Sequence, residues 1–233
     1  MDLFVITHKQ VNVDAYPERN IIFVGKKQEE LLKKNEASNV FRDGSGDNIA
    51  DKNWTYCETT AMYWIDHNIS DSDYIGIEHY RRLFCDWKKR PRSQAYLLKQ
   101  LETHDVVVKI NWCYFFRNKD WFVWHHGKEN YKAMRNAIAK LYPDYLPFFD
   151  RRMRSNIISY CNMMVAPKAI YHDYCKFLFD VLFETEKHIS IPKTGHNSRM
   201  MGFMAERLLD VYLDKNKLKK KGSLVLMTDR GLI

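Results

Sequence analysis

The chain has 233 residues, of which 45% are hydrophobic and 14% aromatic, while glycine and proline are few. This composition predicts a folded protein with a sizeable core and excludes a disordered or low-complexity chain. The five cysteines are odd in number and form no C-x-x-C pair, so they predict neither a disulfide framework nor a zinc ribbon. No stretch resembles a signal peptide or approaches the roughly 20 apolar residues of a membrane span. We therefore expect a cytoplasmic protein, with peripheral attachment to the inner face of the cell membrane as an alternative.

The formal charge of +8 favours anionic partners such as nucleic acid, anionic lipid or a nucleotide diphosphate. Part of the excess lies in a late lysine run, and we interpret residues 216–233 as a solvated basic tail. The alternative is a patch that holds the protein near anionic lipid headgroups, each basic residue contributing on the order of 1 kcal/mol. The lysines of this run are Lys215, Lys217, Lys219, Lys220 and Lys221.

Strands and helices alternate in the first half of the chain. Residues 2–7 and 20–25 are short apolar runs, as expected of strands covered on both faces, and a polar loop is expected over 35–51. Apolar residues at three- and four-residue spacing predict a helix over 54–68. Further strands are predicted at 73–78 and 105–110, and a further helix over 93–103.

Helices dominate the second half. An aromatic-rich loop is expected over 112–124 and a strand at 162–166, and the predicted helices cover 128–141, 145–153, 167–188 and 199–215. No repeat or linker divides the chain, which predicts a single domain over 1–233. Its expected fold is an α/β fold with a mostly parallel sheet, covered by helices on both faces, and a helical C-terminal part.

Ligands of such sheets bind outside the carboxyl ends of the strands. The predicted strand ends carry His8 and Lys9, Gly25, the segment 78–82 and Lys109. The segment 78–82 brings one acid, one imidazole and two guanidinium groups together, and arginine binds phosphate bidentately. These groups predict an electropositive rim suited to a diphosphate, although segment 78–82 could equally be an ion-paired strand end.

Several motifs occur along the chain in a recognisable order. They are Asp51-Lys52-Asn53, Tyr56-Cys57-Glu58-x-Thr60-Ala61-x-Tyr63-Trp64, Tyr74-Ile75-Gly76-Ile77-x-His79-Tyr80-Arg81-Arg82, Asn162-Met163 and Gly202-Phe203-x-x-Glu206-Arg207-Leu208-Leu209. Together they resemble a family of capsular and lipopolysaccharide-synthesis glycosyltransferases long labelled as a domain of unknown function, which includes galactofuranosyltransferases. The resemblance covers nearly the whole chain, and its HYRR and GF-x-x-ERLL elements are the most specific.

This resemblance implies a GT-A-like, Rossmann-like glycosyltransferase. Residues 1–110 would form its nucleotide-binding part and residues 111–215 its acceptor-side, helical part. It further implies a hexosyltransferase that moves galactose or galactofuranose, with inversion, from a UDP-linked donor to a lipid-linked surface polysaccharide. The implied donor-binding residues are Thr7, His8, Lys9, Gly25, Asp51, Lys52, Asn53, His79, Arg81, Arg82 and Lys109.

The sequence departs from the Asp-x-Asp metal motif that follows a central strand in GT-A enzymes. Asp71-Ser72-Asp73 has the right letters but precedes its strand, which indicates a turn. Glu78 and His79 could ligate Mn²⁺ or Mg²⁺ instead, or the two arginines could replace the metal by neutralising the leaving diphosphate. We favour the metal-free version slightly.

An inverting transfer needs a base that takes the proton of the acceptor hydroxyl. Glu206 is the first candidate, although it could be an ordinary helix glutamate paired with Arg207 or Arg199, and His126 is the second. The aromatic segment 112–124 could be a platform for the acceptor sugar, or it could be core or membrane-facing surface. The expected acceptor-side residues are Tyr80, Trp124, His125, Asn162 and Arg199.

Two other classes of function compete with an enzyme. The high pI and the mixture of basic and aromatic residues suggest a nucleic-acid-binding module, but no such motif is found and we expect no nucleic-acid partner. A non-catalytic scaffold of a polysaccharide assembly complex would keep the donor site without turnover, and the lack of a properly placed Asp-x-Asp leaves this alternative open.

Overall fold

The computed structural model of the chain describes residues 1–35, 37–113, 115–158 and 160–228. Its N-terminal half contains a parallel ladder of strands in the order β3-β2-β1-β4. Strands β1 and β2 are buried along most of their length, which explains their continuous apolar sequence. The strands are β1 (Asp2–Thr7), β2 (Asn20–Phe23), β3 (Val40–Arg42) and β4 (Tyr74–His79). Strand β3 lies within the stretch expected to be loop.

Beyond β4 the sheet becomes mixed. The pairs β4–β5, β5–β10, β6–β9 and β4–β9 are antiparallel, and β6–β10 is parallel. The expectation of a mostly parallel sheet is therefore wrong for this half. Strand β5 follows β4 after only two residues, and such a short connection can only produce an antiparallel neighbour. The strands are β5 (Arg82–Cys85), β6 (Val106–Lys109), β9 (Met164–Pro167) and β10 (Lys220–Met227).

The C-terminal segment is part of this sheet. Strand β10 lies between β5 and β6, so the solvated tail expected over 216–233 is wrong where the structure describes it, and residues 229–233 lie outside the described part. Lys220 and Lys221 occupy the start of the strand, while Leu224, Val225 and Leu226 supply its aliphatic run. Because the lysine run is so polar, the sequence analysis did not predict a strand from this short aliphatic run.

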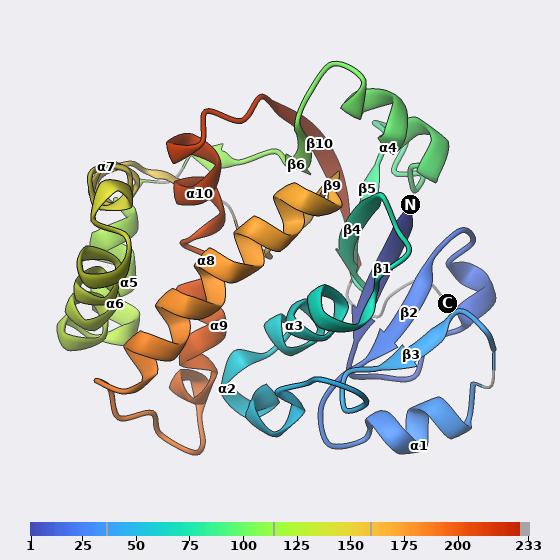
Figure 1. Cartoon of the computed structure of the whole chain (residues 1–233), viewed down its shortest axis with the longest axis horizontal. Helices are drawn as coiled ribbons and strands as arrows, with labels where there is room; N and C mark the ends of the chain where they lie inside the picture. The colour runs from blue at the N-terminus through green and yellow to red at the C-terminus, as the bar shows by residue number, and fades with distance from the viewer. Residues whose placement is uncertain (36, 114, 159, 229–233) are drawn as a thin grey trace.

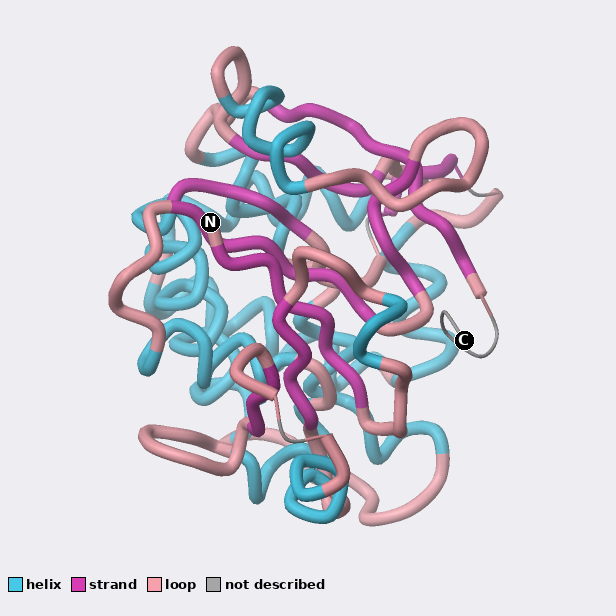
Figure 2. The backbone as a smooth tube through the Cα atoms, turned by 90° about the vertical axis from the view of Figure 1, so that its right-hand side faces the viewer, coloured by secondary structure: helices cyan, strands magenta, loops and turns pink. Residues whose placement is uncertain are grey.

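Helices lie on both sides of the sheet, as expected, and Figure 2 shows the strands grouped toward the viewer with most helices behind them. The main core packs α3, α8, α9 and α10 against β1, β4, β6 and β9. On the other side, Leu97 of α4 joins a smaller core with Leu3 and Phe84. These helices are α3 (Thr59–Asn68), α4 (Gln94–Leu101), α8 (Lys168–Glu186), α9 (Met200–Ala205) and α10 (Leu209–Lys215).

Three predicted elements are divided differently in the structure. The helix expected over 54–68 is split into α2 and α3 at Cys57, which has a positive φ of 53°. The helix expected over 199–215 is split into α9 and α10. The aromatic loop expected over 112–124 contains strand β7 and most of helix α5. The remaining bounds are α1 (Gln28–Lys33), α2 (Asn53–Tyr56), β7 (Trp112–Cys113), β8 (Ile157–Ile158), η1 (Val13–Ala15), η2 (Ala50–Lys52), η3 (Pro143–Tyr145) and η4 (His196–Arg199).

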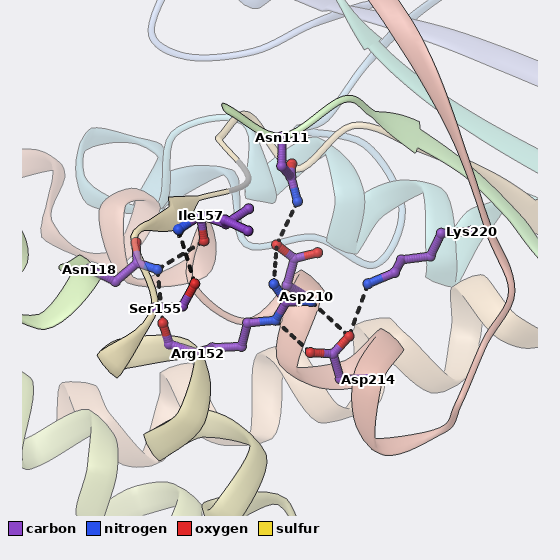
Figure 3. Close-up of polar contacts among 8 residues, drawn as sticks. All are labelled: Asn111, Asn118, Arg152, Ser155, Ile157, Asp210, Asp214 and Lys220. Atoms are coloured by element: carbon purple, nitrogen blue, oxygen red, sulfur yellow. Dashed lines mark hydrogen bonds and ion pairs between the residues drawn. The ribbon is translucent and has the colours of Figure 1, made fainter. Parts of the chain in front are cut away.

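Helices α5 (Asn118–His126), α6 (Lys128–Leu141) and α7 (Leu146–Arg154) form a group at the left of Figure 1, away from β1–β3. A polar network ties this group to α10 and β10 (Figure 3). Arg152 of α7 donates two hydrogen bonds to Asp214, at 2.5 and 2.8 Å, and Lys220 donates to the same carboxylate at 2.9 Å. Within the described residues, no helix is long and apolar enough to cross a bilayer.

Candidate functional site

A cavity of about 410 Å³ lies at the carboxyl ends of β1, β2 and β4, where the fold predicts a ligand. The loop after β1 and the β4–β5 turn form one side, and α2 with Arg199 forms the other. Because the sequence predicts that the nucleotide donor binds here, this cavity is called the donor cavity below. Its polar and aromatic lining comprises Thr7, His8, Asn53, Trp54, Cys57, Glu58, His79, Tyr80, Arg81, Arg82 and Arg199.

Cations dominate the donor cavity. Burial lowers the pKa of His8, and the positive charges of Lys9, Arg81 and Arg199 lower it further. The guanidinium of Arg81 lies 5.2 Å from the centre of the Tyr80 ring. Two buried atoms, Tyr80 Oη and Arg82 Nε, have no hydrogen-bond partner among the described residues. Both residues line the donor cavity, although these two atoms themselves are shielded from solvent.

Other predicted residues shape the wall of this cavity. Thr7 Oγ1 donates to the carbonyl of Lys9 and accepts from its N–H, which fixes the turn after β1. Gly25 has a φ of +82°, and a Cβ there would lie 3.0 Å from Asn53 Oδ1. Asn53 in turn donates to the carbonyl of Cys57 and to Thr60 Oγ1. Thr7, Gly25 and Asn53 therefore hold the backbone in shape, while Lys9 is exposed beside the cavity.

Glu58 is a site residue that the sequence reasoning missed. It follows the α2–α3 break and lines the donor cavity, where Asn162 Nδ2 lies 3.4 Å from its Oε1. Tyr174 donates to Asn162 Oδ1, so Asn162 positions Glu58 without lining the cavity. Burial raises the pKa of Glu58, and the charge of Arg199 opposes this. The signal was present, since Glu58 lies inside one of the motifs quoted above.

A second cavity of about 670 Å³ shares Arg82 with the first. Glu206, 19% exposed, accepts a hydrogen bond from the Cys161 N–H at 3.1 Å and another from Arg207 at 3.4 Å. Burial raises the pKa of Glu206, and the nearby charge of Glu58 raises it further, against the effect of Arg207. We call this space the Glu206 cavity. Its lining is Arg82, Lys109, Cys113, Tyr160, Cys161, Glu206 and Met227.

The structure does not bring Glu78 and His79 together as a metal site. Adjacent strand residues point to opposite faces, which the sequence could have indicated. Glu78 is buried on the other face, where its two oxygens bind Arg19 at 2.8 Å and the Phe84 N–H at 2.6 Å. His79 Nε2 bonds to the carbonyl of Cys161 at 2.5 Å, and burial lowers the pKa of His79 to about 4. No group of three or more metal-ligating side chains occurs in the part of the chain that was described.

Several predicted residues line neither cavity. Lys52 pairs with Glu186 at 2.7 Å, and Asp51 is exposed. His125 Nδ1 bonds to the carbonyl of Trp121, and neighbouring Trp124 is exposed. His126, proposed as a base, is buried elsewhere: its Nδ1 bonds to Asn197 Oδ1 at 2.9 Å and its ring stacks on Phe203. Lys109 is an exception: it lines the Glu206 cavity, although it was predicted to bind the donor.

Comparisons with known proteins agree with this fold. A solved structure described as "WbbM bifunctional glycosytransferase apo structure" superimposes with a TM-score of 0.78 at 24% sequence identity. The match covers 99% of this chain and 46% of that one, so the chain spans less than half the length of that protein. No curated protein matches the sequence. The family model described as "Domain of unknown function (DUF4422)" matches residues 2–217, and the chain belongs to this family.

Proposed function

We propose that the chain is a glycosyltransferase that uses a nucleotide diphosphate sugar. The observation that carries the proposal is the group of three guanidinium side chains, Arg81, Arg82 and Arg199, that line one cavity at the strand ends. A diphosphate offers the oxygen acceptors and the negative charge that these groups lack. The fold shared with a bifunctional glycosyltransferase supports the same class of reaction.

The two cavities suit the two substrates. Arg81, Arg82 and Arg199 would hold the diphosphate of the donor, and the Glu206 cavity would receive the acceptor. The acceptor hydroxyl oxygen would attack the anomeric carbon, Glu206 would take its proton, and the bond from that carbon to the diphosphate would break. The leaving diphosphate gains negative charge, which Arg82 can stabilise from its position between the cavities.

The finer assignment rests on the family resemblance in the motifs. We propose a hexosyltransferase with a UDP-linked galactose or galactofuranose donor, an inverting reaction and a lipid-linked polysaccharide acceptor. We also propose that the arginines replace a metal ion. Glu78 and His79 do not fit as ligands of Mn²⁺ or Mg²⁺, since both carboxylate oxygens of Glu78 already bind Arg19 and the Phe84 N–H.

The direct test is isothermal titration with UDP, UDP-galactose, UDP-galactofuranose and matched ADP and GDP compounds, once with Mn²⁺ and once with chelator. We expect saturable binding of the uridine compounds that chelator does not weaken. Binding only with Mn²⁺ would contradict the proposal that the arginines replace a metal ion. Absence of binding under both conditions would reject the donor site and, with it, the proposed enzyme.

A further inference from the structure

The N-terminal part of α5 and the residues before it carry an exposed group of aromatic side chains, called the aromatic patch below. It consists of Phe115, Phe116, Trp121 and Trp124. Phe115 is fully exposed, Phe116 is 54% exposed and Trp124 is 75% exposed. The other face of α5 already supplies the core with Phe122 and His126. The patch is therefore not needed to fold this helix, and its exposure calls for another explanation.

Three of the rings lie side by side, and of these Trp121 is partly buried. The ring centres of Phe116, Trp121 and Trp124 lie 6.2–6.4 Å from one another. Isolated exposed apolar residues are common in proteins, but neighbouring large ones mark an interaction surface. Tryptophan in particular prefers the boundary between water and lipid, where its ring can be buried while its N–H stays hydrated.

Basic residues outnumber acidic ones near the aromatic patch, where Asp120 is also exposed. Arg117 and Lys119 are exposed at the start of α5, and Arg154 is exposed at the end of α7. The Asn118 N–H donates to the Ser155 carbonyl, which brings these two helix ends together. Basic residues around exposed aromatic rings are the combination that binds anionic lipid headgroups and the apolar layer beneath them.

The aromatic patch is presented on a fixed support. Asn118 Nδ2 donates to the carbonyls of Arg152 and Ile157, at 2.9 and 3.0 Å (Figure 3). Arg152 is held by Asp214 in the same network. The start of α5 is thus attached to α7 and, through it, to α10.

The aromatic patch also adjoins the Glu206 cavity. Cys113, two residues before Phe115, lines that cavity. Asn118 and Ile157 line a small space beside it together with Glu206. A flat surface resting on the patch would therefore lie near the cavity that contains the candidate base.

From these observations we infer that the aromatic patch docks the protein on the surface of an anionic phospholipid bilayer. The rings enter the interfacial layer, and Arg117, Lys119 and Arg154 contact the headgroup phosphates. This inference does not depend on the proposed reaction. It replaces the basic C-terminal tail as the membrane contact, since residues 220–227 of that segment form strand β10.

The test is co-sedimentation with vesicles of phosphatidylcholine alone and of phosphatidylcholine mixed with phosphatidylglycerol. We expect binding to the mixed vesicles, and a loss of affinity on the order of 10²-fold in the double variant Phe116→Ser, Trp124→Ser. Trp87→Ser is the matched control, because Trp87 is 76% exposed and lies outside the patch. The double variant Arg117→Gln, Lys119→Gln should weaken binding to mixed vesicles by about fivefold for each charge removed.

Three outcomes would overturn the inference. They are no binding of the parent protein to mixed vesicles, an equal loss in the Trp87 control, and concentration-dependent self-association that the aromatic double variant abolishes. The last outcome would assign the patch to a second copy of the chain. Titration with UDP-galactose in the absence of vesicles keeps the two proposals apart, since we expect the aromatic variant to bind donor as the parent protein does.

Discussion

Arg81 and Arg82 illustrate how a single turn can bring two cations to a cavity. Arg81 lies in the two-residue turn after β4 and Arg82 begins β5, so the antiparallel return of the chain holds both at the edge of the donor cavity. We expect Arg81→Ala to weaken donor binding by about 1.5–3 kcal/mol, the usual cost of losing a hydrogen bond to a charged group. Titration calorimetry measures this directly. Arg90→Ala is the control, because Arg90 is exposed and paired with Asp86 outside the cavity; equal losses in both variants would contradict a specific contact.

Glu206 is the residue whose charge the proposed reaction requires. Replacing it by Gln keeps the shape and a polar oxygen for the Cys161 N–H but removes the base. We expect turnover to fall roughly 10²–10⁴-fold while donor affinity stays unchanged. Single-turnover kinetics together with donor titration separate the two effects. Full activity in a folded Glu206→Gln protein would assign the proton transfer to another group, of which Glu58 is the nearest acid in the donor cavity.

The two glutamates also make a prediction about pH. The negative charge of Glu58 raises the pKa of Glu206, so removing that charge must lower it. In Glu58→Gln, the acidic limb of the kcat/KM profile should therefore move to lower pH, because Glu206 stays deprotonated further into the acid range. A pH series of initial rates measures the shift. An unmoved limb with a reduced plateau would show that Glu58 acts by another route.

At the scale of elements, His126 joins helix α5 to the segment around η4 and α9. Burial lowers its pKa to about 4 from an ordinary value of 6.5. Between these values the unfolded chain binds the proton and the folded one does not, so the stability that His126 provides falls as pH falls. Above pH 6.5 this contribution is complete.

The variant His126→Phe should remove this dependence, at the cost of the hydrogen bond to Asn197. We expect the free energy of unfolding of the parent protein to drop, relative to the variant, by about 2–4 kcal/mol between pH 6.5 and pH 4. Urea unfolding at several pH values measures the difference. Two curves that stay parallel across this range would contradict the neutral, buried imidazole.

For the whole molecule, sequence reasoning succeeded where the signal was local. The apolar runs of β1 and β4 and the polar residues that end them predicted the edge of the sheet at which the cavity of about 410 Å³ lies. Sequence reasoning failed where contacts between segments far apart in the sequence determine the local structure. Nothing near Cys57 in sequence indicates the positive φ that turns Glu58 into the cavity, and strand β10 exists because β5 and β6 flank it.

The last prediction concerns strand β10. The family match ends at residue 217, but the sheet continues beyond it into this strand. Residues 224–227 pair with β5, and residues 220–223 pair with β6. Strand β5, which carries Arg82, has only one register pair with β4, so it depends on β10 for its ladder. A chain truncated after Lys217 should therefore lose the fixed position of Arg82 as well as stability. We expect its melting temperature to fall by about 10 °C. We also expect it to lose donor binding.

A synthetic peptide covering residues 218–228 should restore both properties, because the gap between β5 and β6 offers it two ladders of backbone hydrogen bonds. The same peptide with Val225→Pro is the matched control, since proline removes an N–H and disfavours the strand. Thermal unfolding followed by circular dichroism, and donor titration with and without peptide, measure the rescue. If the truncated chain binds donor as tightly as the full chain, the strand is an accessory to the sheet. If only the unmodified peptide restores binding, the C-terminal strand is a working part of the donor cavity.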